Sequence, residues 1–111
     1  RLTGVARAAA LQLADAVEAT PGLRLLARPD STLVAFVADD PGALDVHAVA
    51  DVLWREGWYV DRQGPPASVH CTVNAAHEHT MPMFVEALRA AVTEVQSTAA
   101  SGAQGAYGTV E

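Results

Sequence analysis

Three breaks rich in proline and glycine divide this chain into short segments and limit the helices and strands that it can form. They are Thr20-Pro21-Gly22, Asp39-Asp40-Pro41-Gly42 and Gly64-Pro65-Pro66. Proline lacks an amide donor and glycine readily adopts positive φ, so helices and strands end at such positions. No apolar run reaches the roughly 20 residues that a membrane-spanning helix needs. The chain is therefore expected to form one small domain of short elements, with no membrane segment.

Apolar side chains recur with helical spacing in three segments: residues 2–20, the segment from Asp45 to Gly57, and a segment that begins at Thr80 and ends near Ser97. Asp45 and Thr80 are suitable N-cap residues. The predicted buried faces comprise Leu2, Val5, Ala6, Ala9, Leu13, Ala16, Val17 and Thr20, then Val46, Val49, Ala50, Leu53 and Trp54, then Met81, Phe84, Val85, Leu88, Ala91, Val92 and Val95.

Four short segments have the composition of strands: residues 23–27, 32–38, 58–62 and 68–74. The second is apolar at nearly every position, which is typical of a central strand covered on each side. The fourth alternates, so that Val69, Cys71 and Val73 point one way while Ser68, His70, Thr72 and Asn74 point the other.

The resulting order, α-β-β-α-β-β-α, predicts an α+β fold. We expect a two-layer sandwich in which a largely antiparallel four-stranded sheet has helices on one face. Residues 1–97 form the predicted domain, and residues 98–111 form a tail rich in Gly, Ala and Ser that is mobile unless a partner orders it.

Charge and rare residues exclude several functions. The net charge is −6 and the arginines are scattered singly, which argues against nucleic-acid binding. One cysteine, Cys71, cannot form an internal disulfide, and this favours a cytoplasmic protein. The chain contains no lysine, so it cannot perform chemistry that needs a lysine amine. It begins with Arg1 rather than Met, so we expect it to be a piece of a longer protein.

Motifs in the second half of the chain are distinctive in order and spacing. They are Gly57-Trp58-Tyr59-Val60-Asp61, Pro65-Pro66-Ala67-Ser68-Val69-His70, the helical stretch Phe84–Val92, and Gly102-Ala103-Gln104-Gly105-Ala106-Tyr107-Gly108. Together they resemble the C-terminal region of the group II pyridoxal-phosphate-dependent decarboxylases, and especially the sphingosine-1-phosphate lyase branch. The resemblance extends from about Val5 to Gly108.

This resemblance implies the small C-terminal domain of a fold-type-I pyridoxal-phosphate (PLP) enzyme, with the cofactor lysine on a large upstream domain. The implied activity is that of a carbon–carbon lyase, either an aldehyde-lyase similar to the sphingosine-1-phosphate lyases or an amino-acid carboxy-lyase. This domain would close over the small-molecule substrate and orient it, and would supply no catalytic, cofactor-binding or metal-binding residue. The implied partners are the large PLP domain and a second copy of the enzyme in a homodimer.

Two residues are candidates for substrate binding. Tyr107, between glycines in the tail, would donate a hydrogen bond to a substrate phosphate or carboxylate, although a lone aromatic residue in a frayed tail is the more common case. His70 matches a histidine of the family and would approach the substrate channel, although a histidine on a strand more often satisfies neighbouring polar groups.

The remaining polar cluster and the remaining hypothesis are less specific. His77-Glu78-His79 lacks a further ligand at a suitable spacing, so loop and cap roles are favoured over a metal site. The alternative to a lyase domain is a stand-alone ligand-binding or dimerisation module without catalysis, since small α+β folds serve many functions.

Overall fold

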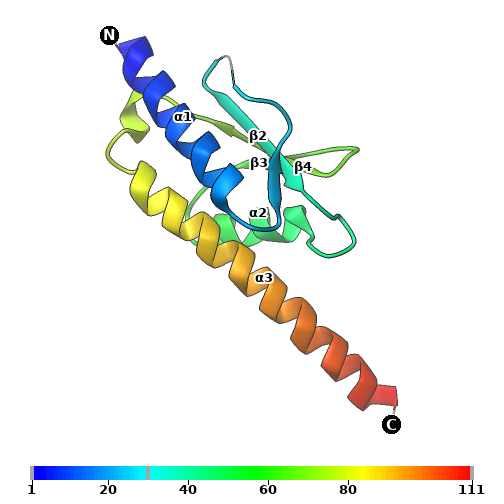
Figure 1. Ribbon diagram of the computed structural model, residues 1–111. Coiled ribbons are helices and arrows are strands. Elements are labelled where there is room, and N and C mark those ends of the chain that lie inside the picture. The colour runs from blue at the N-terminus through cyan, green and yellow to red at the C-terminus, as the bar shows by residue number, and fades with distance from the viewer. Residues whose placement is uncertain (1, 30, 111) are drawn as a thin grey trace.

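The protein is described here by a computed structural model, which covers the backbone of residues 2–29 and 31–110 and the side chains of residues 4–29 and 31–100. Its elements are α1 (Leu2–Ala19), β1 (Leu23–Leu25), β2 (Leu33–Ala38), α2 (Val46–Arg55), β3 (Asp61–Gln63), β4 (Ser68–Thr72), the 3-10 helix η1 (Ala75–His77) and α3 (Met81–Val110). The strands form one antiparallel sheet in the order β1-β2-β4-β3 (Figure 1). The predicted class and element order are confirmed, with η1 as an addition.

All three helices lie on the same side of the sheet. α1 packs against β1 and β2, α2 packs against β3 and β4, and α3 crosses the outer surfaces of α1 and α2 (Figure 1). The prediction that residues 32–38 are covered on each side is therefore confirmed only in part. On the side without helices, Val37 is buried, but Ala35 is half-buried and Leu33 is 44% exposed. The described residues leave the Leu33 end of this face uncovered.

One continuous core joins the sheet to the helices. Val34, Phe36 and Val69 point from β2 and β4 toward the helices and are fully buried. The predicted inner face of α3 is buried throughout, and so is most of that of α1. The apolar stripe of α2 is buried except for Trp54, which is 50% exposed. Trp54 lies at the edge of the core because its indole Nε1 donates to the carbonyl of Val60 at 2.8 Å.

The third strand begins later than its sequence suggests. Residues 58–62 were expected to pair, but β3 starts at Asp61. The amide of Trp58 donates to the carbonyl of Leu53, and the carbonyl of Val60 accepts from Trp54. Because these two backbone groups form hydrogen bonds with the end of α2, residues 58–60 do not join the sheet. Only residues 61–63 pair with β4.

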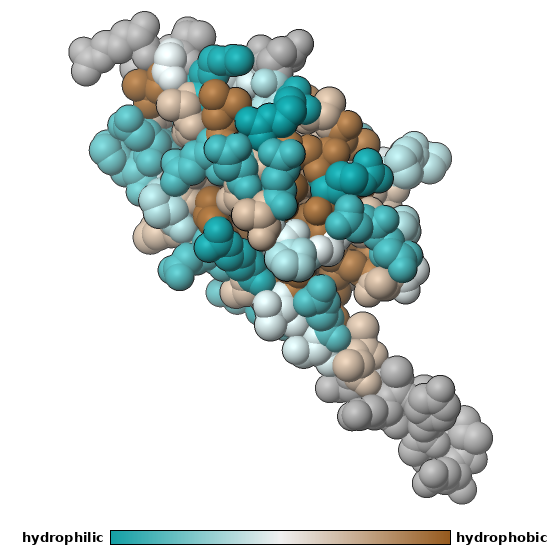
Figure 2. Space-filling view, in the orientation of Figure 1, coloured by the Kyte–Doolittle hydropathy of each residue, from teal (hydrophilic) through white to brown (hydrophobic). Residues whose placement is uncertain are grey.

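The last helix continues through the segment expected to be a tail. α3 runs to Val110, well beyond Ser97, and projects from the domain (Figure 1). The alanine-rich stretch after Ser97 contains no proline, so the helical hydrogen-bond ladder can continue. Figure 2 shows a mixed, largely hydrophilic surface along the described part of α3. The hydrophobic patches in this view lie over the other elements of the domain. The backbone of residues 98–110 thus continues the helix; the division at residue 97 and the mobility of the tail stay predictions.

Leu88→Ala tests the contribution of α3 to the core. Leu88 is fully buried, so we expect the substitution to lower the free energy of unfolding by about 3 kcal/mol. Urea denaturation followed by circular dichroism measures the change. The matched control is Leu26→Ala, because Leu26 is 45% exposed and should cost less than about 0.5 kcal/mol. Equal losses for the two variants would contradict the position assigned to α3.

Candidate functional site

The helix-free face of the sheet carries His70 at its centre. In the strand register, Ala35 of β2 and Asp61 of β3 lie on either side of His70 of β4. Residues in register share a face, so the imidazole stands between a small apolar residue and a carboxylate. The sequence correctly placed His70 on the polar side of its strand.

His70 is held by a neighbour on the same face. A hydrogen bond of 3.2 Å joins His70 Nε2 to Ser68 Oγ, and Ser68 is buried. The imidazole itself is half-buried, so it remains accessible from the open side of the sheet. An imidazole fixed at one nitrogen can use the other to donate to, or accept from, an arriving group. This arrangement is suited to orienting a polar ligand, a role that stays a prediction.

Apolar side chains border this polar centre. Leu26 and Leu33 are 45% and 44% exposed. Leu26 continues the alternation of β1, since its amide donates to the carbonyl of Ala35 at 2.9 Å. Exposed leucines on a sheet face that no helix covers are typical of an interaction surface.

The second predicted binding residue, Tyr107, cannot be related to this face. Its backbone belongs to α3, but its side chain lies outside the described residues. Its role stays a prediction.

A pocket of about 410 Å³ opens beside the end of the sheet, where β3 has not yet begun. Trp58 and Phe84 stand in its wall edge to face, with ring centroids 5.2 Å apart. Tyr59 lies in the lining and is 72% exposed. The pocket is lined by Leu13, Gly57, Trp58, Tyr59, Val60, Cys71, Thr72, Val73, Ala76, His77, Thr80, Met81 and Phe84.

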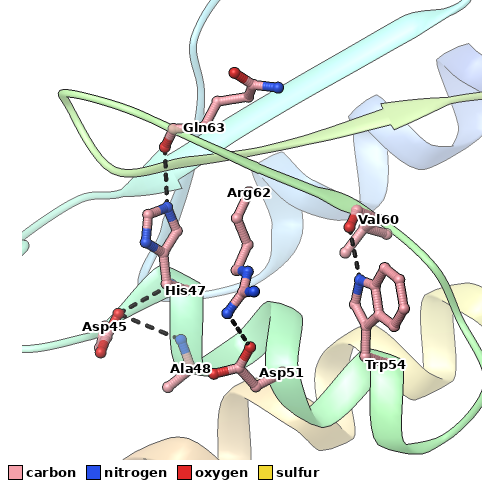
Figure 3. A network of polar contacts seen from close by, with 8 residues as sticks. All are labelled: Asp45, His47, Ala48, Asp51, Trp54, Val60, Arg62 and Gln63. Atoms are coloured by element: carbon pink, nitrogen blue, oxygen red, sulfur yellow. Dashed lines mark hydrogen bonds and ion pairs between the residues drawn. The ribbon is translucent and has the colours of Figure 1, made fainter.

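Contacts from α2 hold the segment that forms one wall of the pocket (Figure 3). Besides the bond from Trp54 to Val60, the Nε2 of His47 donates to the carbonyl of Gln63 at 2.9 Å. Arg62 donates to a carboxylate oxygen of Asp51 at 2.6 Å. α2 is itself anchored at its N-terminus, where Asp45 accepts from the amides of His47 and Ala48, as its predicted cap role requires. Residues 58–63 are therefore positioned by three side chains of one helix.

Cys71 forms part of the pocket floor and is the small buried apolar residue that its strand position predicts. It is 7% exposed. Burial, with a smaller contribution from the charge of Asp61, raises the pKa of Cys71 to about 12. The thiol is therefore neutral at physiological pH and is not a nucleophile there.

His77 has a local structural role, as the loop and cap interpretation of residues 77–79 predicts. Its Nδ1 accepts from the amide of Asn74 at 3.0 Å, while the Asn74 side chain accepts from the amide of Ala76. These reciprocal contacts cap η1. Within the described side chains, no three His, Cys, Asp or Glu residues come together as a metal site.

No pattern in the sequence indicated the pocket. Its lining comes from α1, the segment before β3, the end of β4, η1 and the start of α3, which are far apart in the chain. The nearest local indication of the pocket is the pair of aromatic residues Trp58 and Tyr59. Both line it, and Tyr59 is exposed and precedes β3 rather than belonging to it.

Known proteins similar to this chain are found by sequence and by structure, although no family model matches it. It is 31% identical over 81 residues to the sphingosine-1-phosphate lyase of Oryza sativa subsp. japonica, a match covering 73% of this chain and 14% of the relative. It is 30% identical over 89 residues to that of Arabidopsis thaliana, covering 80% and 16%. The chain is therefore similar in sequence to a segment of these sphingosine-1-phosphate lyases.

Solved structures share the fold of this chain. The sphingosine-1-phosphate lyase of Burkholderia pseudomallei superposes with a TM-score of 0.76 and 24% identity, covering 94% of this chain and 23% of that one. Glutamate decarboxylase of Lactobacillus brevis gives 0.75 and 16%, covering 84% and 23%. C-DES, solved with glycine covalently linked to its PLP cofactor, gives 0.64 and 18%, covering 78% and 23%. The resemblance to PLP-dependent decarboxylases and lyases that the motifs indicated is confirmed.

The chain spans only 14% to 16% of the length of these curated relatives. In the part of the chain that the structure describes, no helix combines the length and hydrophobicity that crossing a membrane requires.

The buried thiol of Cys71 provides a test of the pocket floor. At pH 8 we expect iodoacetamide to modify Cys71 at least about a hundredfold more slowly in the folded chain than in urea, because burial restricts access and keeps the thiol protonated. Mass spectrometry follows the reaction. Equal rates in both states would show that Cys71 is not buried.

The same pKa shift has a consequence for stability. The folded state keeps its proton to a higher pH than the unfolded state, so this contribution is fully present below about pH 9 and is lost as the pH rises toward about 12. Cys71→Ser, whose hydroxyl does not titrate in this range, should show a weaker decline in stability between these values, measured by urea unfolding at each pH.

Proposed function

We propose that this chain is the small domain of a PLP-dependent carbon–carbon lyase, and that it closes over the substrate and orients it. The observation that carries the proposal is the superposition of 94% of this chain on a sphingosine-1-phosphate lyase with a TM-score of 0.76, while only 23% of that enzyme is matched. The sequence relatives named as sphingosine-1-phosphate lyases support the same assignment.

The residues of this chain do not fit the role of holding the cofactor. PLP is bound covalently through a lysine amine, and the chain contains no lysine. We therefore assign the cofactor and the bond-breaking step to a larger upstream domain, and limit this chain to positioning.

The helix-free face is the surface that we place against the large domain. Leu26 and Leu33 would lose their exposed apolar area there, and each would contribute up to about 1 to 2 kcal/mol on burial. The half-buried His70 would then face the junction between the domains, where water is excluded and hydrogen bonds to a ligand strengthen.

Within that junction we assign His70, held by Ser68, to the polar end of the substrate. Tyr107 is a second candidate for the same end, as its place in the glycine-rich motif suggests. Both act by orienting the substrate. A bound group held in the productive geometry lowers the entropic part of the barrier without any covalent contribution from this chain.

The names of the sequence relatives favour an aldehyde-lyase that acts on a phosphorylated sphingoid base over an amino-acid carboxy-lyase. We further propose that the whole enzyme is a cytoplasmic homodimer.

The DNA upstream of the codon for Arg1 tests the assignment most directly. We expect several hundred further codons in the same reading frame, including a His-Lys pair after a predicted strand. The longer polypeptide should form a borohydride-trappable adduct with PLP, and the 111-residue chain should not. A start codon immediately before Arg1 would overturn the proposal in favour of the stand-alone binding module.

His70→Gln in that longer enzyme tests substrate orientation. We expect kcat/KM to fall by about tenfold or more with the visible absorbance of the cofactor unchanged, because His70 would contact substrate and not PLP. Ser68→Ala, which keeps the imidazole but removes its hydrogen bond, should give a smaller loss. Unchanged kcat/KM in His70→Gln would remove this residue from the site.

A further inference from the structure

We propose that the pocket between α1, η1 and the start of α3 binds a single aliphatic chain of an amphiphilic molecule. Binding of such a chain is inferred from the pocket alone. The identification of the chain as the hydrocarbon part of the substrate rests on the proposed function.

The walls of the pocket select for an uncharged, apolar occupant. Leu13, Val73 and Phe84 are buried side chains of the floor and wall. None of the described residues that line it is Asp, Glu or Arg, so a charged group placed inside would lose its water without gaining an opposite charge. An aliphatic chain has no such cost and gains from each methylene that leaves water.

The pocket is large enough for a ligand and is built before one arrives. Its volume of about 410 Å³ falls within the range of roughly 300 to 1,000 Å³ that small-molecule sites occupy. The Trp58–Phe84 ring pair and the hydrogen bonds from α2 to residues 58–63 fix one wall. A preformed wall means that little side-chain freedom is lost on binding.

Polar side chains at the mouth indicate that the occupant has a polar end. Tyr59 and Thr72 are exposed there, and the Nδ1 of His77 accepts from Asn74, which leaves Nε2 as the donor of the neutral ring. An exposed hydroxyl or ring nitrogen can bind a head group that stays in contact with water, while the chain enters the apolar interior. This combination matches an amphiphile better than a wholly apolar ligand.

One residue of the lining, Thr72, belongs to the helix-free side of the sheet. Thr72 lines the pocket and lies two residues beyond His70, on the same side of β4. Alternate residues of a strand are about 7 Å apart. One molecule could therefore place its polar end near His70 and its aliphatic chain in the pocket. Sphingosine-1-phosphate, which the names of the relatives specify, has a phosphorylated polar end and a long hydrocarbon chain.

The first experiment titrates the 111-residue chain with 1-hexanol, 1-octanol and 1-decanol and follows tryptophan fluorescence. Both tryptophans are kept, because Trp54 holds Val60 and Trp58 forms part of the pocket wall. We expect a saturable change in emission as Trp58 contacts the alcohol. The dissociation constant should fall about fourfold for each added methylene. O-phosphoethanolamine, a head group without a chain, should give no response.

Ala76→Phe places a phenyl ring in the pocket from an exposed position of η1, so that it does not disturb the core. We expect it to weaken binding of 1-decanol at least tenfold. The matched control is Ala67→Phe, an exposed position in the turn before β4 that does not line the pocket, which should bind 1-decanol as the unmodified chain does. Unchanged binding in Ala76→Phe, or an affinity that does not depend on chain length, would overturn the proposal.

The longer enzyme distinguishes the substrate from another lipid as the source of the chain. If the substrate supplies it, Ala76→Phe should raise KM for a long-chain substrate and leave KM for a short-chain analogue unchanged. A loss of 1-decanol binding without any change in KM would overturn the assignment to the substrate. Because the alcohol titration requires no cofactor, its failure leaves the lyase proposal intact, and the upstream reading frame decides that proposal separately.

Discussion

The structure depends on the burial of one face of a four-stranded sheet against helices that share a single core. Phe36 and Val69 point from the two central strands into this core and are fully buried. Among the described elements, α1 and α2 cover this face and α3 packs against both. The other face is covered only in part: Val37 and Ser68 are buried there, but Leu26 and Leu33 are exposed and His70 is half-buried.

The strand β4 connects the two surfaces that we relate to function. Because its side chains alternate, Cys71 faces the core and the pocket while His70 faces the open side. The pocket exists because residues 58–60 bind to the end of α2 instead of pairing with β4. A strand that was longer by these residues would extend the sheet edge and change the wall of the pocket.

The lack of lysine and the homology to sphingosine-1-phosphate lyases lead to the same division of labour. A chain without a lysine amine cannot hold PLP covalently, and the relatives contain a much longer sequence in which another part can do so. In the function that we propose, such a segment contributes positioning and the exclusion of water. Thr72, which lines the pocket, lies on the same side of β4 as His70.

Local chemistry in the sequence was sufficient for the element order, the cap at Asp45, the alternation of residues 68–73 and the family resemblance, because breaks, caps and periodicity act within a few residues. It did not predict the late start of β3 or the exposure of Trp54, and it expected cover over both sides of residues 32–38, where the described residues leave Leu33 exposed. Those features depend on which distant backbone groups and surfaces compete for the same partners. Residues 58–60 have the composition of a strand. In the folded chain, however, the amide of Trp58 and the carbonyl of Val60 form hydrogen bonds with residues of α2 instead of with β4. This outcome depends on the packing of α2 beside them, which the sequence alone does not reveal.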